Sequence, residues 1–427
     1  MVFQKDSKSF RKRNNFFQKK KNRLSALIGR PIFILLWGME NFEEKTCLCA
    51  LNRIFGFMPK AGIALISHLG SASELFSLNA GELDEILGPY PAVRNKITLK
   101  AKEEAAEELL KLEKSGIGFI GWNEEDYPAL LHECEDAPIG LYVRSSTPPG
   151  QLWLPNRKIA VVGTRDISPY GKEWCKRTVA CLGNSEEKPV IISGLALGTD
   201  ICAHKTALEC GLPTIGVMAT GPETVYPYRH TALAEKMCET PGCALVTDYP
   251  PGTAPLAIHF LRRNRIIAGL SDSTILIESK IKGGGMMTCR LAFSYNREVY
   301  ALPGRIDDLR SQGCNHLIKN KVAEPITSMS ELINSLNLKN IPGRRKANEE
   351  ETVKAAYAAR LPKEMTAQAV GIITLIKKER GISIEDIAIR TGSDYVGTSN
   401  IIAMLEMDGY VATDVLQRCF LMAEKFR

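Results

Sequence analysis

The stretch that decides the fold is residues 158–194, KIAVVGTRDISPYGKEWCKRTVACLGNSEEKPVIISG. Its two ends, 158–163 and 189–194, are apolar runs of strand length, and the amphipathic segment 170–183 between them has the spacing of a helix. Strands that are apolar on both faces and alternate with helices are typical of a parallel sheet covered on both sides. The stretch therefore predicts a strand–helix–strand crossover.

The same alternation continues toward the C-terminus, and two more strands are predicted within 117–145. We therefore predict an α/β fold, an extended Rossmann-like, doubly wound parallel sheet over residues 116–330 with its core at 155–328. The further strands are expected at 213–219, 243–249, 273–279 and 298–304, and the further helices at 199–210, 231–239, 259–269 and 286–296.

Two smaller regions flank this predicted domain. Short helical segments broken by Gly and Pro predict a helical domain at 39–115. Charge blocks mixed with Pro and Gly predict a linker at 338–366. Residues 367–427 then have the pattern of a helix, a helix-turn-helix and a hairpin-like wing, which predicts a winged-helix-like domain.

The composition is that of an ordinary globular protein. The 427 residues are 44% hydrophobic and 24% charged, which excludes wholesale disorder, collagen and coiled coil as classes. The net charge of +7 is uneven, because residues 1–30 hold ten of the 55 basic residues and only one of the 48 acidic ones. A polyanion must therefore be held, in the rest of the chain, by a local cluster of bases and backbone dipoles.

Residues 1–38 form a basic extension that could be a nucleic-acid arm or a targeting segment. Because Met39 begins a sensible domain, we interpret the extension as disordered or as lying upstream of the true start. Its apolar run, 32–37, is far shorter than the ~20 residues that span a bilayer, and we expect no membrane partner. The twelve cysteines include no CxxC and no zinc-finger spacing, which fits a cytoplasmic protein without a metal site.

Ligands of open α/β sheets bind beyond the carboxyl ends of the strands, so the strand-end loops are the first place to search. Four of these loops are rich in Gly, hydroxyls or Arg: 163–171, 193–200, 282–288 and 303–305. Glycines let backbone amides approach an anion, and a helix that follows directs its positive end toward it. Phosphate is the natural ligand of several such loops, although each glycine alone could serve only a tight turn.

The densest basic feature is HFLRRNRIIAGL at 259–270. Guanidinium groups bind phosphate bidentately, and Phe260 beside them resembles the stacking-plus-cation arrangement of single-strand binding proteins. Three arginines within four positions of a helix also face different directions, so at least one could instead pair with a core acid such as Asp248 or Glu278.

Other chemistries find little support. The first strand is followed by GTRDIS rather than GxGxxG, the second ends in Ser193, and no Walker A loop is present, so we expect no nucleotide cofactor. Asp200 and His204 are spaced to share a helix face, either as a general-base pair or metal ligands or as a helix-start acid and a core histidine. No Ser/His/Asp or Cys/His set stands out, and we predict no catalytic residue.

These motifs resemble the DprA (Smf) family of bacterial DNA-processing proteins. The resemblance runs from about Glu44 to Pro325, and the order of SGLAxGxDxxAH before RNRIIAGLS is highly specific. The pieces that carry it are VVGTRDISPYG, SGLALGTDICAHKTAL, ETVYP, DYPPGTAP, FLRRNRIIAGLS and VYALPGRIDDLRSQGCNHLIKN.

The resemblance implies a homodimer that holds single-stranded DNA in a positive pocket of a Rossmann-like core and helps to load a RecA-type recombinase during natural transformation. It also implies a helical domain of sterile-alpha-motif (SAM) type before the core and a winged helix after it. Together, the residues and the resemblance give this candidate DNA-binding set: Gly163, Thr164, Arg165, Ser193, Gly194, Leu195, Lys205, Phe260, Arg262, Arg263, Asn264, Arg265, Gly284, Gly285 and Thr288.

Two other functions are weighed against this one. The same superfamily resembles nucleotide-processing phosphoribohydrolases, which work through PGGxGTxxE, but here GGGMMTCR lacks the GT spacing and has Arg290 in place of the acid. The winged-helix-like region could read duplex DNA, but its helix TSNIIAMLEMDG has no Arg or Lys, so a protein-contact role is favoured.

Overall fold

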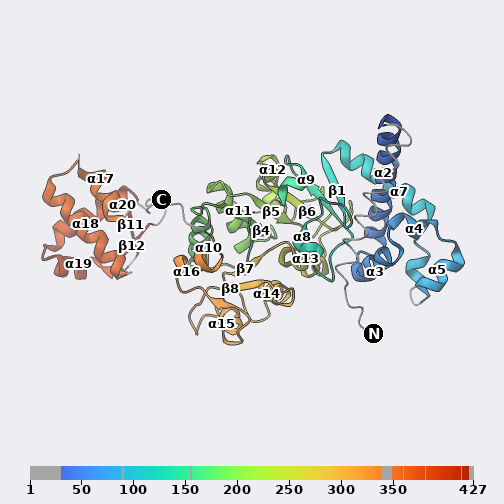
Figure 1. The fold of residues 1–427 in the computed structure, drawn as a ribbon. Helices are drawn as coiled ribbons and strands as arrows, with labels where there is room; N and C mark the ends of the chain where they lie inside the picture. Colours follow the sequence, from blue (N-terminus) through green and yellow to red (C-terminus); the bar gives the residue numbers. More distant parts are fainter. Residues whose placement is uncertain are drawn as a thin grey trace. The chain divides into compact units, whose positions relative to one another are not determined.

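The computed structural model describes residues 30–422 except 89–90, 154–155, 339–348, 359, 380 and 415. The chain divides into two compact units, residues 1–340 and 341–427, and each is described by itself. Figure 1 shows the helices and strands of both units and labels most of them as they are named below. Among the described residues no helix combines the length and apolar character that crossing a membrane requires.

The first unit begins with helices that pack around one apolar core, which includes Leu48, Phe55 and Leu109. The first helix starts at Arg30, within the stretch 1–38 that was interpreted as an extension, and that interpretation stays a prediction. A proline is tolerated in the first turn of a helix, so Pro31 does not prevent this start. Residues 1–29 lie outside the described residues. The helices are α2 (Arg30–Ile54), α3 (Pro59–Leu69), α4 (Ala72–Ser77), α5 (Ala80–Leu87), α6 (Pro91–Arg94) and α7 (Leu99–Lys114).

A nine-stranded sheet follows, in the order β1-β2-β6-β5-β4-β3-β7-β8-β9. All pairs from β6 to β9 are parallel, which confirms the predicted mostly parallel sheet. The strands β1 and β2, predicted ahead of the core, join the same sheet as an antiparallel edge. The strands are β1 (Ile117–Gly121), β2 (Gly140–Arg144), β3 (Lys158–Val162), β4 (Val190–Ser193), β5 (Thr214–Val217), β6 (Ala244–Thr247), β7 (Ser273–Leu276), β8 (Glu298–Ala301) and β9 (Glu324–Pro325).

Helices cover both faces of this sheet, as the doubly apolar strands predict. Alternate residues of β3 show this, because Ala160 and Val162 share a core with α13 and α14, whereas Ile159 and Val161 share another with α10 and α11. The helices are α8 (Ala129–His132), α9 (Pro149–Leu152), α10 (Pro169–Leu182), α11 (Thr199–Glu209), η1 (Tyr228–His230), α12 (Thr231–Glu239), α13 (Ala257–Gly269), α14 (Gly284–Ser294), α15 (Gln312–Lys319) and α16 (Met329–Ser335).

The described residues of the second unit form four helices and a small antiparallel sheet of order β10-β12-β11. Part of the stretch predicted as a linker, 338–366, is helical instead, because Val353 and Tyr357 lie one turn apart and are buried in the core of this unit. The elements are α17 (Glu349–Ala358), α18 (Lys363–Lys378), β10 (Ile382–Ser383), α19 (Ile384–Thr391), α20 (Tyr395–Met407), β11 (Val411–Thr413) and β12 (Arg418–Leu421).

Candidate nucleic-acid site

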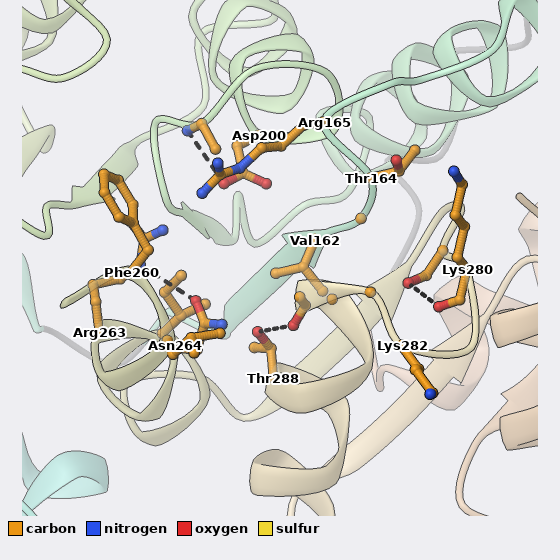
Figure 2. A pocket seen from close by; sticks show the side chains of 18 of the residues that line it. Val162, Thr164, Arg165, Asp200, Phe260, Arg263, Asn264, Lys280, Lys282 and Thr288 are labelled. Carbon is orange, nitrogen blue, oxygen red and sulfur yellow. Dashed lines mark hydrogen bonds between the residues drawn. The ribbon is translucent and has the colours of Figure 1, made fainter. Parts of the chain in front are cut away.

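A pocket of about 440 Å³ lies beyond the carboxyl ends of β3 and β7. These neighbouring strands are followed by helices on opposite faces of the sheet, α10 after β3 and α14 after β7. Such a point, where the strand order changes direction, is where open α/β sheets bind their ligands. Figure 2 shows the pocket, with Lys280 and Lys282 on one side and Phe260 on the other.

Close backbone packing holds the loops of the pocket together. A Cβ atom on Gly163 would lie 2.4 Å from the Thr199 Oγ1, and one on Gly285 would lie 3.2 Å from the Gly163 Cα. Gly198 has a φ of +77°, and a Cβ there would lie 2.3 Å from the Thr164 carbonyl oxygen. That carbonyl accepts hydrogen bonds from the Thr199 amide, at 3.1 Å, and from its hydroxyl, at 3.2 Å. The glycines therefore fix the turn that carries Arg165.

Three exposed cations surround the pocket: Arg165, Lys280 and Lys282. The Arg165 guanidinium lies 5.1 Å from the centre of the Phe260 ring, in cation–π geometry. In the described part of the chain, none of the three forms an ion pair with a carboxylate. The neighbouring acid Asp166 is paired with Arg310 at 2.7 Å. The three positive charges are therefore available to an anion.

Two helices begin at the pocket. The helices α11 and α14 start at Thr199 and Gly284, and neither has a side chain that caps its first amides. The start of a helix carries partial positive charge and unpaired N–H groups, so both helix starts favour a bound anion. Asp200 opposes this in part; its carboxylate accepts a 3.3 Å bond from the Ala196 amide, and burial raises its pKa although Arg263 acts in the other direction.

Arg263 lines the pocket but its guanidinium is committed to the protein interior. It is only 3% exposed, and its Nη1 donates to the Gly194 carbonyl at 2.6 Å and to the Val217 carbonyl. Burial is the main reason that its pKa falls to about 10, well above neutral pH, so the group stays charged. Arg263 therefore joins the ends of β4 and β5 and adds positive potential beneath the pocket rather than an exposed donor.

The other two arginines of this helix point away from the pocket, whereas the candidate DNA-binding set includes all three. Arg262 donates to the Gly56 carbonyl and lies 4.0 Å from the centre of the Phe57 ring, against the N-terminal helices. Arg265 is buried, forms a 2.5 Å ion pair with Asp248 and donates to the Asp136 carbonyl. Arg265 is therefore the arginine that pairs with a core acid, which was the alternative to binding phosphate. Glu278 instead accepts hydrogen bonds from the amide and hydroxyl of Ser168.

Four more predicted residues lie outside the pocket. The Ser193 hydroxyl is fully buried and donates to the Val161 carbonyl at 2.6 Å. Gly194 contributes its carbonyl to Arg263, and Leu195 packs in a small core near Met218. Lys205 is exposed on α11 but does not line the pocket. The nine predicted residues that do line it are Gly163, Thr164, Arg165, Phe260, Arg263, Asn264, Gly284, Gly285 and Thr288.

The sequence reasoning missed Lys280 and the charge of Lys282. Both lie in the loop between β7 and α14, whose glycines were considered, so the strand-end rule could have identified them. It also missed Asp200 as a pocket residue. His204, its spacing partner, is fully buried, with its Nδ1 2.8 Å from the Thr214 hydroxyl, and burial lowers its pKa to about 3. His204 is therefore a packed core histidine rather than a general base or a metal ligand, among the described residues.

Comparison with known proteins gives a consistent family. A model described as DNA recombination-mediator protein A matches residues 118–337. Protein Smf of Escherichia coli is 38% identical over 226 residues, which are 53% of this chain and 58% of that protein, so the match covers less than two thirds of that relative. DNA processing protein DprA of Streptococcus pneumoniae is 38% identical over 210 residues, 49% of this chain and 71% of that protein. Its X-ray structure covers 69% of this chain and 97% of its own, with 30% identity and a TM-score of 0.57.

Proposed function

Because the chain belongs to the DNA recombination-mediator protein A (DprA/Smf) family, we propose that it binds single-stranded DNA, without regard to base sequence, in the pocket beyond β3 and β7. The single observation that carries this proposal is that two strand-end loops bring three cations without an ion-pair partner, Arg165, Lys280 and Lys282, around one pocket. Phosphates are alike in every strand, so contacts of this kind position a strand but do not read it.

The size of the pocket favours an unpaired strand over a duplex. A volume of about 440 Å³ lies in the range that holds one drug-sized molecule, and a nucleotide has this size. A base in a duplex is stacked and paired, so it would have to be extruded before entering, whereas a single-stranded base enters freely. Phe260 at the rim offers a flat apolar face for stacking, and every base has a matching face.

The proposal is tested by titrating a labelled oligo-dT into the full-length protein at several salt concentrations. Three phosphate contacts predict that log affinity falls against log salt with a slope of about −2. The triple variant Arg165→Ala/Lys280→Ala/Lys282→Ala is expected to bind weakly and with an almost flat slope. Lys236→Ala, which removes one exposed charge from the end of α12 away from the pocket, is the matched control and keeps the wild-type slope. Equal affinity of the triple variant and the wild type, or equal affinity for blunt duplex and oligo-dT, contradicts the proposal.

The family resemblance alone extends the proposal to assembly and partners. We infer a homodimer that protects incoming DNA and helps to load a RecA-type recombinase in natural transformation. Light scattering of the purified chain tests the dimer, and recombinase filament formation on strands coated with single-strand binding protein tests the loading. The SAM-like and winged-helix-like labels of the flanking regions, and a protein-contact role for the second unit, are proposals of the same kind. In that unit α20 carries no Arg or Lys and exposes Val396 and Met407.

A further inference from the structure

Two cysteines face each other where α10 packs against α11. The Cys175 Sγ on α10 lies 3.8 Å from the Thr199 carbonyl oxygen on α11, and the Cys202 Sγ on α11 lies 3.8 Å from the Lys172 carbonyl oxygen on α10. In each case the contacted carbonyl is three residues before the other cysteine. This reciprocal pattern places the two cysteines opposite each other between the helices, where each thiol influences the pKa of the other.

The two thiols differ in access and in acidity. Cys175 is fully buried, whereas 7% of Cys202 is exposed to solvent. The Cys175 thiol lowers the pKa of Cys202, and the nearby charges of Lys176 and Lys172 lower it further. The pKa of Cys175 is raised by Cys202 and by burial. Cys202 is therefore the thiol of the pair that ionises more readily, and the thiolate is the reactive form of cysteine.

We propose that Cys202 is an oxidation site and that Cys175 is its resolving thiol, so that hydrogen peroxide links α10 to α11 by a disulfide. In the first step the Cys202 thiolate attacks a peroxide oxygen; the O–O bond breaks, Cys202 becomes a sulfenic acid and hydroxide leaves, which takes up a proton to form water. In the second step the Cys175 sulfur attacks the Cys202 sulfur, the S–O bond breaks and a second water leaves with the Cys175 proton. One hydroperoxide is thus reduced for each pair of thiols oxidised.

The linked helices both begin beside the pocket. The helix α10 follows the turn of Arg165, and α11 begins at Thr199, which bonds the Thr164 carbonyl in that turn. The disulfide would therefore fix the two helix starts that frame one wall of the candidate site. This inference stands apart from the proposed function, because it concerns the thiols and requires no bound DNA.

A second pair of neighbouring cysteines provides an internal control. Cys289 and Cys314 belong to the same apolar core, and both are fully buried. Burial raises the pKa of Cys289 strongly and that of Cys314 to about 12, so neither is ionised at neutral pH. If closeness of two cysteines were sufficient, peroxide would oxidise both pairs. If oxidation requires a thiolate that solvent can reach, only Cys202 and Cys175 should be oxidised.

The test treats the native full-length protein with hydrogen peroxide, blocks the remaining thiols with iodoacetamide and maps the peptides by mass spectrometry. We expect a disulfide-linked peptide pair that contains Cys175 and Cys202, while Cys289 and Cys314 stay alkylated. Since the thiolate fraction sets the rate, oxidation is expected to be faster at pH 8 than at pH 6. In Cys175→Ser the reaction should stop at a sulfenic acid on Cys202, which dimedone traps.

Three results would overturn the inference. If Cys202 is oxidised no faster than Cys289, Cys202 is not a reactive site. If Cys202 forms a disulfide with a cysteine other than Cys175, the assigned partner is wrong. Accumulation of the Cys202 sulfenic acid in the wild-type protein, without a disulfide, removes the resolving role of Cys175. Peptide mapping of the wild type decides all three, so the test does not depend on the folding of Cys175→Ser.

Discussion

Replacing Arg263 by Ala is expected to destabilise the first unit rather than simply to remove a DNA contact. The substitution strands two buried carbonyl oxygens, those of Gly194 and Val217, that the guanidinium now satisfies. Each stranded group costs about 1–3 kcal/mol, and release of the guanidinium from its dehydrated site offsets part of this. A net loss of about 2–4 kcal/mol follows, which corresponds to a fall in Tm of about 5–15 °C for a large domain.

Tryptophan fluorescence is a suitable assay, because all four tryptophans of the chain lie at or before position 174 and none lies in the second unit. Arg165→Ala is the contrasting variant: its exposed side chain leaves the Tm within about 1–2 °C, while affinity for oligo-dT falls. Arg263→Lys should be intermediate, since one ammonium cannot span both carbonyls as a guanidinium does. An unchanged Tm in Arg263→Ala, together with lost DNA binding, would refute this reasoning and make Arg263 a direct phosphate contact.

Two further predictions concern the frame of the pocket. In Gly198→Ala the new Cβ would lie 2.3 Å from the Thr164 carbonyl oxygen, so both the Tm and the affinity for oligo-dT should fall. Gly70 is the control, because it also has a positive φ but no atom lies within 4 Å of a Cβ built there. Gly70→Ala should lower the free energy of unfolding by only about 1 kcal/mol and leave DNA binding unchanged. Burial lowers the pKa of His204 to about 3 in the folded protein, whereas in the unfolded chain the imidazole takes up its proton near pH 6.5. Between these two pH values the unfolded state therefore binds more protons than the folded state. The free energy of unfolding accordingly falls as the pH drops through this range. Acidification from about pH 6.5 to 5 should therefore lower the free energy of unfolding by about 1–2 kcal/mol. Denaturant titrations of His204→Gln should show a shallower dependence of stability on pH. The control His68→Gln, at an exposed site, should show the same dependence as the wild type.

Most of the α/β architecture could be predicted from the sequence, because its strands are buried on both faces. The runs at 158–163 and 189–194 became β3 and β4, and the amphipathic segment between them became α10. Periodicity does not encode which strands become neighbours. The antiparallel edge formed by β1 and β2 depends on pairing between β2 and β6, which are about a hundred residues apart in the chain. The helix α17 was missed for a different reason: its charges resemble those of a linker, and only two of its side chains are buried.

The candidate site was predicted in part. Three of the four loops that the strand-end rule selected contribute residues to the pocket, since the rule depends only on sheet geometry, whereas loop 303–305 does not line it. It could not assign directions to side chains on α13, where successive residues are rotated by about 100°. Arg262, Arg263 and Arg265 accordingly face the N-terminal helices, the strand ends and Asp248. The free cations come instead from the loops at Arg165, Lys280 and Lys282.

The contact of Arg262 with Gly56 and Phe57 has a mechanical consequence. The first turns of α13 carry both Phe260, at the rim of the pocket, and Arg262, which is held by the loop between α2 and α3. A helix turn transmits displacement almost rigidly over two residues. A displacement of that loop, for example by a protein bound to the N-terminal helices, is therefore passed through Arg262 to the first turns of α13. The Phe260 ring at the pocket rim then moves with those turns.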